Sequence, residues 1–155
     1  PTHIRLPPAA AVYPANTPAQ DYGRRFAPTR AAGVGGVGIR VLAGGALSGS
    51  AERPPIAGPA PEPLGSAMRY DADVDRARRL IPLVKEGFAA SLTEAATRFA
   101  LSHPAMGTIL VGMATPQQFD DSLAAVQKGP LPQAALELLS TLRQAFSGEL
   151  RGSSE

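Results

Sequence analysis

The alternation of strand-like and helix-like patterns is the feature that most constrains the fold of this chain. Residues 37–43 (VGIRVLA) and 106–112 (MGTILVG) are short, mostly apolar runs, as expected for buried strands. Helical patterns surround these runs, over residues 20–32, 71–84, 91–104, 115–128 and 132–146. This order predicts an α/β fold in which helices cover a parallel sheet, as in an open sheet or a (β/α)8 barrel.

Several of the helices carry recognisable end signals. Ser91 and Glu94 form a capping box, in which a serine oxygen and a glutamate each bind a backbone amide. Thr115 and Gln118 repeat this spacing around a proline at the first helical position. Pro82 predicts an irregularity within the pattern 71–84. Glycines stand where helices are expected to stop, at Gly33, Gly87 and Gly129.

Length and composition predict one domain with an irregular beginning. The 155 residues are 44% hydrophobic, enough for one core. The chain also contains 16 glycines and 16 prolines, mostly before residue 68, which indicates long loops such as 44–66. We expect an irregular lead-in over 1–19 that could include a barrel strand, a structured region over 20–146, and a flexible tail over 147–155.

Composition argues against several classes of function. There is no cysteine, and His3 and His103 lie far apart, so we expect no metal site. The 15 basic and 13 acidic residues are interspersed, which gives no support for nucleic acid as a partner. No apolar run is long enough for a membrane span, and no segment resembles a signal peptide. We therefore expect a soluble, cytoplasmic protein with no membrane partner.

Gly33, Gly35 and Gly38 have the spacing of a dinucleotide-binding glycine fingerprint. That fingerprint requires a strand before the glycines and a helix after them, so that the helix N-terminus faces the phosphates. Here the glycines follow a predicted helix and precede a predicted strand. We therefore interpret this match as a turn and not as a phosphate site.

Two other segments follow the predicted strands, where ligands bind in parallel α/β proteins. Residues 44–49 (GGALSG) contain small residues that would let backbone amides approach a pyrophosphate, with Ser48 as a hydroxyl donor. The alternative for this segment is a plain flexible loop. Residues 112–115 lead into a helix whose first amides could bind an anion, and the alternative there is an ordinary helix cap.

Two stretches resemble the aldo/keto reductase family. The stretch 91–132, SLTEAATRFALSHPAMGTILVGMATPQQFDDSLAAVQKGPLP, is similar to the C-terminal region of those enzymes. The stretch 39–49, IRVLAGGALSG, resembles the end of the seventh barrel strand and the loop that follows it. The resemblance extends over about residues 15 to 146, with both motifs in the family's order.

This resemblance implies the C-terminal portion of a (β/α)8 (TIM) barrel, incomplete at this length because such barrels need about 250 residues. It also implies hydride transfer between a nicotinamide cofactor, NADP or alternatively NAD, and a small-molecule carbonyl or alcohol substrate. The cofactor-binding positions that it implies are Leu42, Ala43, Gly45, Leu47 and Ser48 for the pyrophosphate, and Gly112, Ala114, Thr115, Gln118, Asp121 and Ser122 for the adenosine phosphate and adenine.

The sequence departs from the family at some of these positions. Ala114 replaces a phosphate-binding serine or basic residue, Asp121 replaces glutamate and Ser122 replaces asparagine. Ile39 stands where many members have an aromatic ring that stacks on the nicotinamide. These departures are the reason for keeping NAD as the alternative cofactor.

We assign no catalytic residue. The catalytic tyrosine, aspartate, lysine and histidine of the family match no stretch here, and the sequence suggests no partner for Tyr13, Tyr22 or Tyr70 that would make a proton donor. We therefore expect the cofactor-binding C-terminal part of such an enzyme, either a fragment or a truncated product, inactive alone. The alternative is an inactive half-barrel that binds nucleotide weakly or associates through exposed strand edges.

Overall fold

The computed structural model describes residues 28, 31–61, 69–104 and 106–144. The described part contains two strands, β1 (Gly36–Gly38) and β2 (Met106–Ile109), and five α-helices. The helices are α2 (Tyr70–Arg78), α3 (Pro82–Lys85), α4 (Leu92–Leu101), α5 (Pro116–Gln127) and α6 (Gln133–Gln144). Two 3-10 segments, η2 (Ala43–Ser48) and η3 (Pro55–Ala57), follow β1. The expected lead-in 1–19 and tail 147–155 lie outside the described residues, as does most of the helix expected over 20–32.

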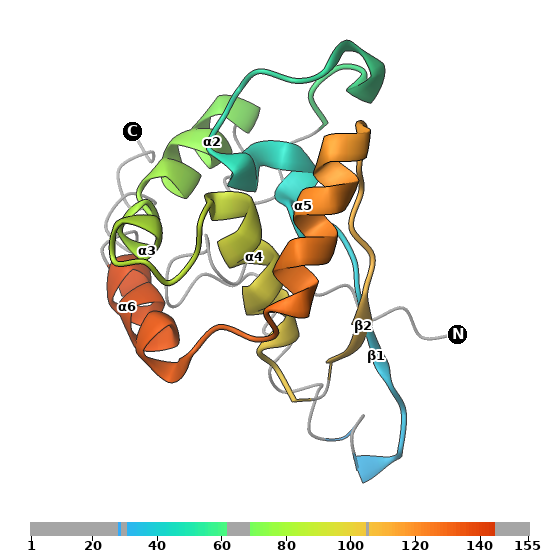
Figure 1. The fold of residues 1–155 in the computed structure, drawn as a ribbon, viewed down its shortest axis with the longest axis vertical. Helices are drawn as coiled ribbons and strands as arrows, with labels where there is room; N and C mark the ends of the chain where they lie inside the picture. The colour runs from blue at the N-terminus through green and yellow to red at the C-terminus, as the bar shows by residue number, and fades with distance from the viewer. Residues whose placement is uncertain (1–27, 29–30, 62–68, 105, 145–155) are drawn as a thin grey trace, which may run out of the picture.

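The two strands pair in parallel, as the sequence predicted. Gly36 is opposite Met106, and Gly38 is opposite Ile109, with an irregularity between Gly36 and Val37. The backbone N–H of Leu110 extends the ladder by donating to the carbonyl oxygen of Gly38 at 2.7 Å. Figure 1 shows the strands side by side at one edge of the described molecule, where α4 lies against β2. The fold is therefore α/β, consistent with part of a barrel.

Both strands are shorter than predicted, and β1 differs more from the prediction. The expected strand 37–43 ends at Gly38, and a turn follows. The cause is the backbone at Arg40 and Ala43, which have φ of 56° and 50°. Left-handed conformations cannot continue a strand, because strand residues need strongly negative φ.

The helices follow their predicted end signals. Pro82 divides the pattern 71–84 into α2 and α3, because proline lacks the N–H that a continuous helix requires. The hydroxyl of Ser91 accepts the N–H of Glu94 at 3.0 Å, as in a capping box. The returning bond goes one residue further back than expected, from the N–H of Ala90 to a Glu94 carboxylate oxygen at 3.3 Å. Gly33, Gly87 and Gly129 all have positive φ.

The hydrophobic core lies among the helices. Its buried side chains come mainly from η2, α2, α3, α4 and α6. Figure 1 shows the two strands to one side of these elements. Leu47 from η2 is 3% exposed and belongs to the same cluster as Leu83 of α3 and Leu139 of α6. A cavity of about 20 Å³ within this cluster is lined by apolar side chains, so it offers water no hydrogen-bond partner. The segment after β1 is therefore anchored in the core.

Candidate cofactor-binding site

The parallel pairing of β1 and β2 brings the two candidate segments to one end of the sheet. The segment after β1 contains η2, and the segment after β2 leads into α5. Carboxyl ends of neighbouring parallel strands lie about 4.8 Å apart, so the chains that leave them begin side by side. This end is where ligands bind in parallel α/β proteins.

Two of the three fingerprint glycines lie at the other end of β1, in the turn before the strand, and the third is the last residue of the strand. Gly33 and Gly35 precede the strand, and Gly33 is in a turn with φ of +67°. Gly38 ends the strand in a crowded position, where an added Cβ would be 3.1 Å from Ile109 Cγ2 and 3.2 Å from Met106 Sδ. A side chain at position 38 would therefore be crowded by side chains of β2.

The segment after β1 has an unusual backbone. Ala43, Gly44 and Gly45 have φ of 50°, 69° and 106°, and Gly49 has φ of 76°. A non-glycine residue in this conformation costs about 1–2 kcal/mol, so the surrounding structure must impose it on Ala43. The N–H groups of Gly45 and Leu47 both donate to the carbonyl oxygen of Leu42, at 2.8 and 3.2 Å. Those two amides therefore stabilise the turn itself.

The five predicted residues of this segment divide into two groups. Ala43 and Leu47 are buried in the core, and Leu42 packs against it half-buried. Gly45 is partly exposed, and Ser48 is exposed with its hydroxyl accepting the N–H of Ser50 at 3.2 Å. Ser48 and the glycine backbone are thus the parts that a ligand could reach. The cofactor assignment of all five residues stays a prediction.

Arg53 and Tyr70 lie against the same turn, and neither is among the predicted site residues. Arg53 Nη1 donates to the carbonyl oxygen of Gly44 at 2.5 Å and to the hydroxyl of Tyr70 at 3.3 Å. The partner that Tyr70 lacked in the sequence is therefore Arg53. No periodic pattern could have indicated this contact, because Arg53 lies in a loop rich in proline and glycine and Tyr70 begins the next helix.

The segment after β2 is organised by its own helix cap. The hydroxyl of Thr115 accepts the N–H of Gln118 at 3.2 Å, and the side-chain oxygen of Gln118 accepts the N–H of Ala114 at 2.7 Å. This is the predicted capping box around the start of α5, with the returning bond again one residue before the cap. The cap satisfies these groups in the absence of a ligand. The anion-binding interpretation of the same segment stays a prediction.

The remaining predicted residues of this segment face different surroundings. Gly112 is exposed, whereas Ser122 is buried with its hydroxyl donating to the carbonyl oxygen of Gln118 at 2.7 Å. Asp121 is exposed and accepts a hydrogen bond from the side-chain amide of Gln117 at 2.9 Å. Residues 110–127 include two acidic residues and no basic one. The segment therefore supplies no cation of its own for a phosphate.

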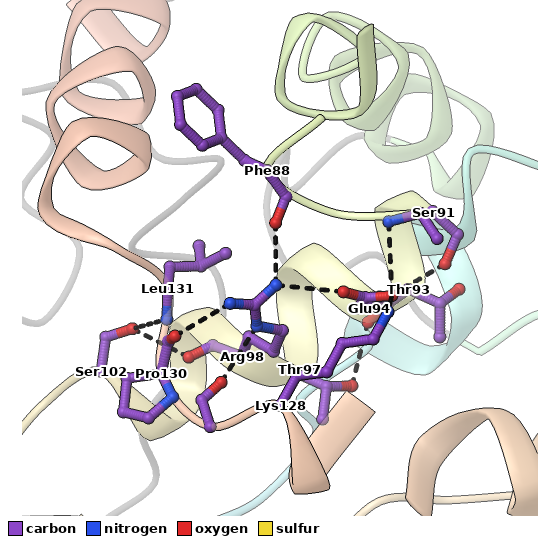
Figure 2. Close-up of polar contacts among 12 residues, drawn as sticks. Phe88, Ser91, Thr93, Glu94, Thr97, Arg98, Ser102, Lys128, Pro130 and Leu131 are labelled. Atoms are coloured by element: carbon purple, nitrogen blue, oxygen red, sulfur yellow. Dashed lines mark hydrogen bonds and ion pairs between the residues drawn. The ribbon is translucent and has the colours of Figure 1, made fainter. Parts of the chain in front are cut away.

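A cluster of ion pairs ties the far end of α5 to α4 (Figure 2). Glu94 accepts from Lys128 Nζ at 2.7 Å and from Arg98 Nη1 at 3.1 Å. Arg98 also donates to the carbonyl oxygens of Phe88, Gly129 and Pro130. These bonds join the loop before α4 to the loop after α5, so the cluster holds the helical layer together.

Glu94 titrates below its usual range because of this cluster. Burial raises the pKa of Glu94, but hydrogen bonds from Lys128, the N–H of Ala90 and Arg98 together outweigh it and lower the pKa. The carboxylate is therefore ionised at neutral pH and occupied by its partners. Such a group stabilises the fold and is not poised for proton transfer.

The residues that the structure describes contain no group of three or more His, Asp or Glu side chains that could hold a metal ion. None of their helices is long and apolar enough to cross a bilayer.

The geometry defines the chain as a parallel α/β protein with two loop segments at the ligand-binding end of its strands. A model of the aldo/keto reductase family matches residues 8–143, and the chain therefore belongs to that family. The family has a TIM-barrel fold, catalyses oxidation and reduction, and generally uses NAD(P)H. A search of curated proteins found no match.

Proposed function

We propose that this chain forms the cofactor-binding part of an NAD(P)H-dependent aldo/keto reductase, with NADP as the expected cofactor and NAD as the alternative. The observation that carries the proposal is the parallel pairing of β1 and β2, which brings the glycine turn and the start of α5 to one end of the sheet. The nicotinamide of such a cofactor exchanges a hydride with a carbonyl or alcohol substrate. The chain's own contribution is to bind and orient the dinucleotide.

The residues of the turn fit a pyrophosphate. Gly44 and Gly45 are partly exposed, so a ligand could reach their backbone. Ser48 is exposed and can donate a hydroxyl hydrogen bond. Arg53 adds a positive charge beside the turn, which favours an anionic ligand. The second segment adds the N-terminus of α5, where the positive end of the helix dipole favours negative charge.

Fluorescence titration of the full chain with NADPH and NADH tests this proposal directly. We expect saturable binding of at least one cofactor, and binding roughly tenfold or more weaker after Ser48→Ala, because one hydrogen bond to a charged group contributes about 1.5–3 kcal/mol. Ser140→Ala is the matched control, since Ser140 is equally exposed but lies on α6. Absence of binding by the unmodified chain would refute the proposal.

We further propose that the chain alone does not reduce carbonyls. The proton-transfer groups of the family match no stretch of this sequence, so a bound nicotinamide would have no proton donor beside it. An assay of NADPH oxidation with a panel of aldehydes and ketones checks this. Measurable turnover by the purified chain would show that a residue of this sequence acts as the proton donor.

A second candidate function is association with another copy of the chain. Phe119, Leu123 and Val126 form an exposed apolar stripe on α5, at 54%, 46% and 40% exposure. Within the described part of the chain, each strand pairs only with the other. A second copy would bring a matching sheet edge and stripe, and parallel edges of this kind are prone to pair. Sedimentation velocity across a concentration series distinguishes the candidates, with Phe119→Ser expected to weaken any dimer.

A further inference from the structure

Arg53 joins three parts of the chain that are separate in sequence. Its Nη1 donates to the carbonyl oxygen of Gly44 in η2 at 2.5 Å and to Tyr70 Oη at the start of α2 at 3.3 Å. Its Nη2 and Nε donate to the carbonyl oxygens of Ala57 and Gly58, at or just after η3, each at 3.3 Å. One guanidinium therefore connects the glycine turn to the loop and helix that follow it.

Arg53 and Tyr70 lie close against the glycine turn. Gly44 and Gly45 have φ of 69° and 106°. Because glycine adopts many other backbone conformations as readily, the two residues do not hold these values by themselves. The turn is pressed against Arg53 and Tyr70, since a Cβ added to Gly45 would be 3.0 Å from Tyr70 Oη and 3.1 Å from Arg53 Nη1. The position of the turn is therefore set by contacts from outside it.

The charge of Arg53 remains available beside the turn. The acceptors of its hydrogen bonds given above are neutral carbonyl and hydroxyl oxygens, and its guanidinium carbon lies 5.6 Å from the centre of the Tyr70 ring. Arginine stays protonated in proteins. A positive charge whose partners are neutral attracts an anion more strongly than a positive charge that is already paired with a carboxylate.

We propose that Arg53 is a positioning residue of the cofactor loop, which holds the carbonyl oxygen of Gly44 inward so that the glycine turn keeps the shape that receives a dinucleotide pyrophosphate. This inference rests on the proposed function, and it identifies the residue that fixes the shape of the loop in the same site. Arg53 acts through Gly44 and Tyr70, and its charge strengthens the attraction for the pyrophosphate.

Hydrogen exchange of the ligand-free chain tests the first part of this proposal. Arg53→Met should speed amide exchange over residues 44–49 by roughly tenfold or more, because it removes a charge-assisted hydrogen bond to the turn. Arg53→Lys should have a smaller effect, since lysine keeps the charge but cannot bridge Gly44, Ala57 and Gly58 at once. Arg40→Met is the matched control, because Arg40 is exposed and lies in the same loop.

Ligand binding tests the second part. Arg53→Met should raise the dissociation constants of NADPH and NADH roughly tenfold or more, with Arg53→Lys intermediate. Binding of adenosine 2′-monophosphate, which contains the adenosine phosphate but no pyrophosphate, should change less than twofold. A general loss of structure would weaken the binding of all three ligands equally. A loss limited to the two dinucleotides therefore indicates that Arg53 positions the loop.

The outcomes separate this inference from the proposed function. Faster exchange over 44–49 together with selective loss of the dinucleotides supports the role of Arg53. Unchanged exchange, or equal losses for all three ligands, overturns it. If the unmodified chain binds none of the ligands, the proposed function fails, while the exchange comparison still decides whether Arg53 holds the turn. If Arg53→Met does not fold, the same exchange and binding measurements are made on Arg53→Lys and compared with the control variant.

Discussion

The two candidate segments lie at the same end of the sheet but are held in different ways. The segment after β1 is anchored by tertiary contacts, with Leu47 in the core and Gly44 bound by Arg53. The segment after β2 is organised locally, by the cap that Thr115 and Gln118 form at the start of α5. The conformation of the segment after β1 should therefore depend on the whole fold, and that of the segment after β2 mainly on its own sequence.

The largest effect is expected from Leu47→Ala. Leu47 is buried among side chains of several helices, so truncation should lower the free energy of unfolding by about 2–5 kcal/mol. Urea unfolding followed by circular dichroism measures this change. Leu123→Ala on α5 is the control, because Leu123 is 46% exposed and a surface change is expected to stay within about 0.5 kcal/mol. Equal effects from the two changes would contradict the anchoring of the first segment.

Gly44→Ala should be the next most damaging. The change requires a left-handed alanine, at about 1–2 kcal/mol, and places a methyl group against the ring of Pro61, which adds about 1–3 kcal/mol of crowding. Gly129→Ala separates these causes, since Gly129 has nearly the same φ of 72° but nothing within 4 Å of an added Cβ. We expect the unfolding free energy to fall further for Gly44→Ala, and a reversed order would show that the turn can move.

Thr115→Ala tests the local character of the second segment. Loss of the cap should cost about 1 kcal/mol and increase hydrogen exchange in the first turn of α5, with little change at residues 44–49. Thr115→Ser retains the hydroxyl oxygen and should remain close to the unmodified protein. Increased exchange in both segments would show that they are coupled, and the contrast between them would then be lost.

The smallest effect is expected from Lys128→Gln, which tests whether α5 also depends on tertiary ion pairs. The pKa of Glu94 is lowered in the folded state. Its ion pairs therefore stabilise the protein at pH values above the usual pKa of a carboxyl group, and this stabilisation is lost as the pH falls through the lowered pKa. Lys128 is half-exposed, which limits the loss at neutral pH to less than about 1 kcal/mol.

Urea unfolding between pH 7 and pH 3 measures this dependence. The difference in unfolding free energy between Lys128→Gln and the unmodified protein should shrink toward acid pH, as Glu94 becomes protonated. Lys85→Gln is the control, since Lys85 is exposed on α3. A difference that does not change with pH would show that Lys128 acts without Glu94.

Local signals explain most of what could be predicted. The caps at Ser91 and Thr115, the break at Pro82 and the glycine turns are decided by neighbouring residues, so the sequence contains them. The predicted strand over 37–43 was too long because its apolar pattern gives no indication of the left-handed backbone at Arg40 and Ala43. Ala43 is itself buried in the core, so its left-handed backbone is held by tertiary packing and not by local preference.

The sequence by itself determined the α/β class, the family, the boundaries of α4, α5 and α6 to within a few residues, and the two segments that follow the strands, because periodicity, capping and motif spacing are properties of short stretches. Only the tertiary structure decided that the two strands are neighbours, that Leu47 is in the core, and that Arg53 holds Gly44 beside Tyr70. These contacts join residues from separate elements. Their geometry depends on how the helices pack, which no single stretch of sequence specifies.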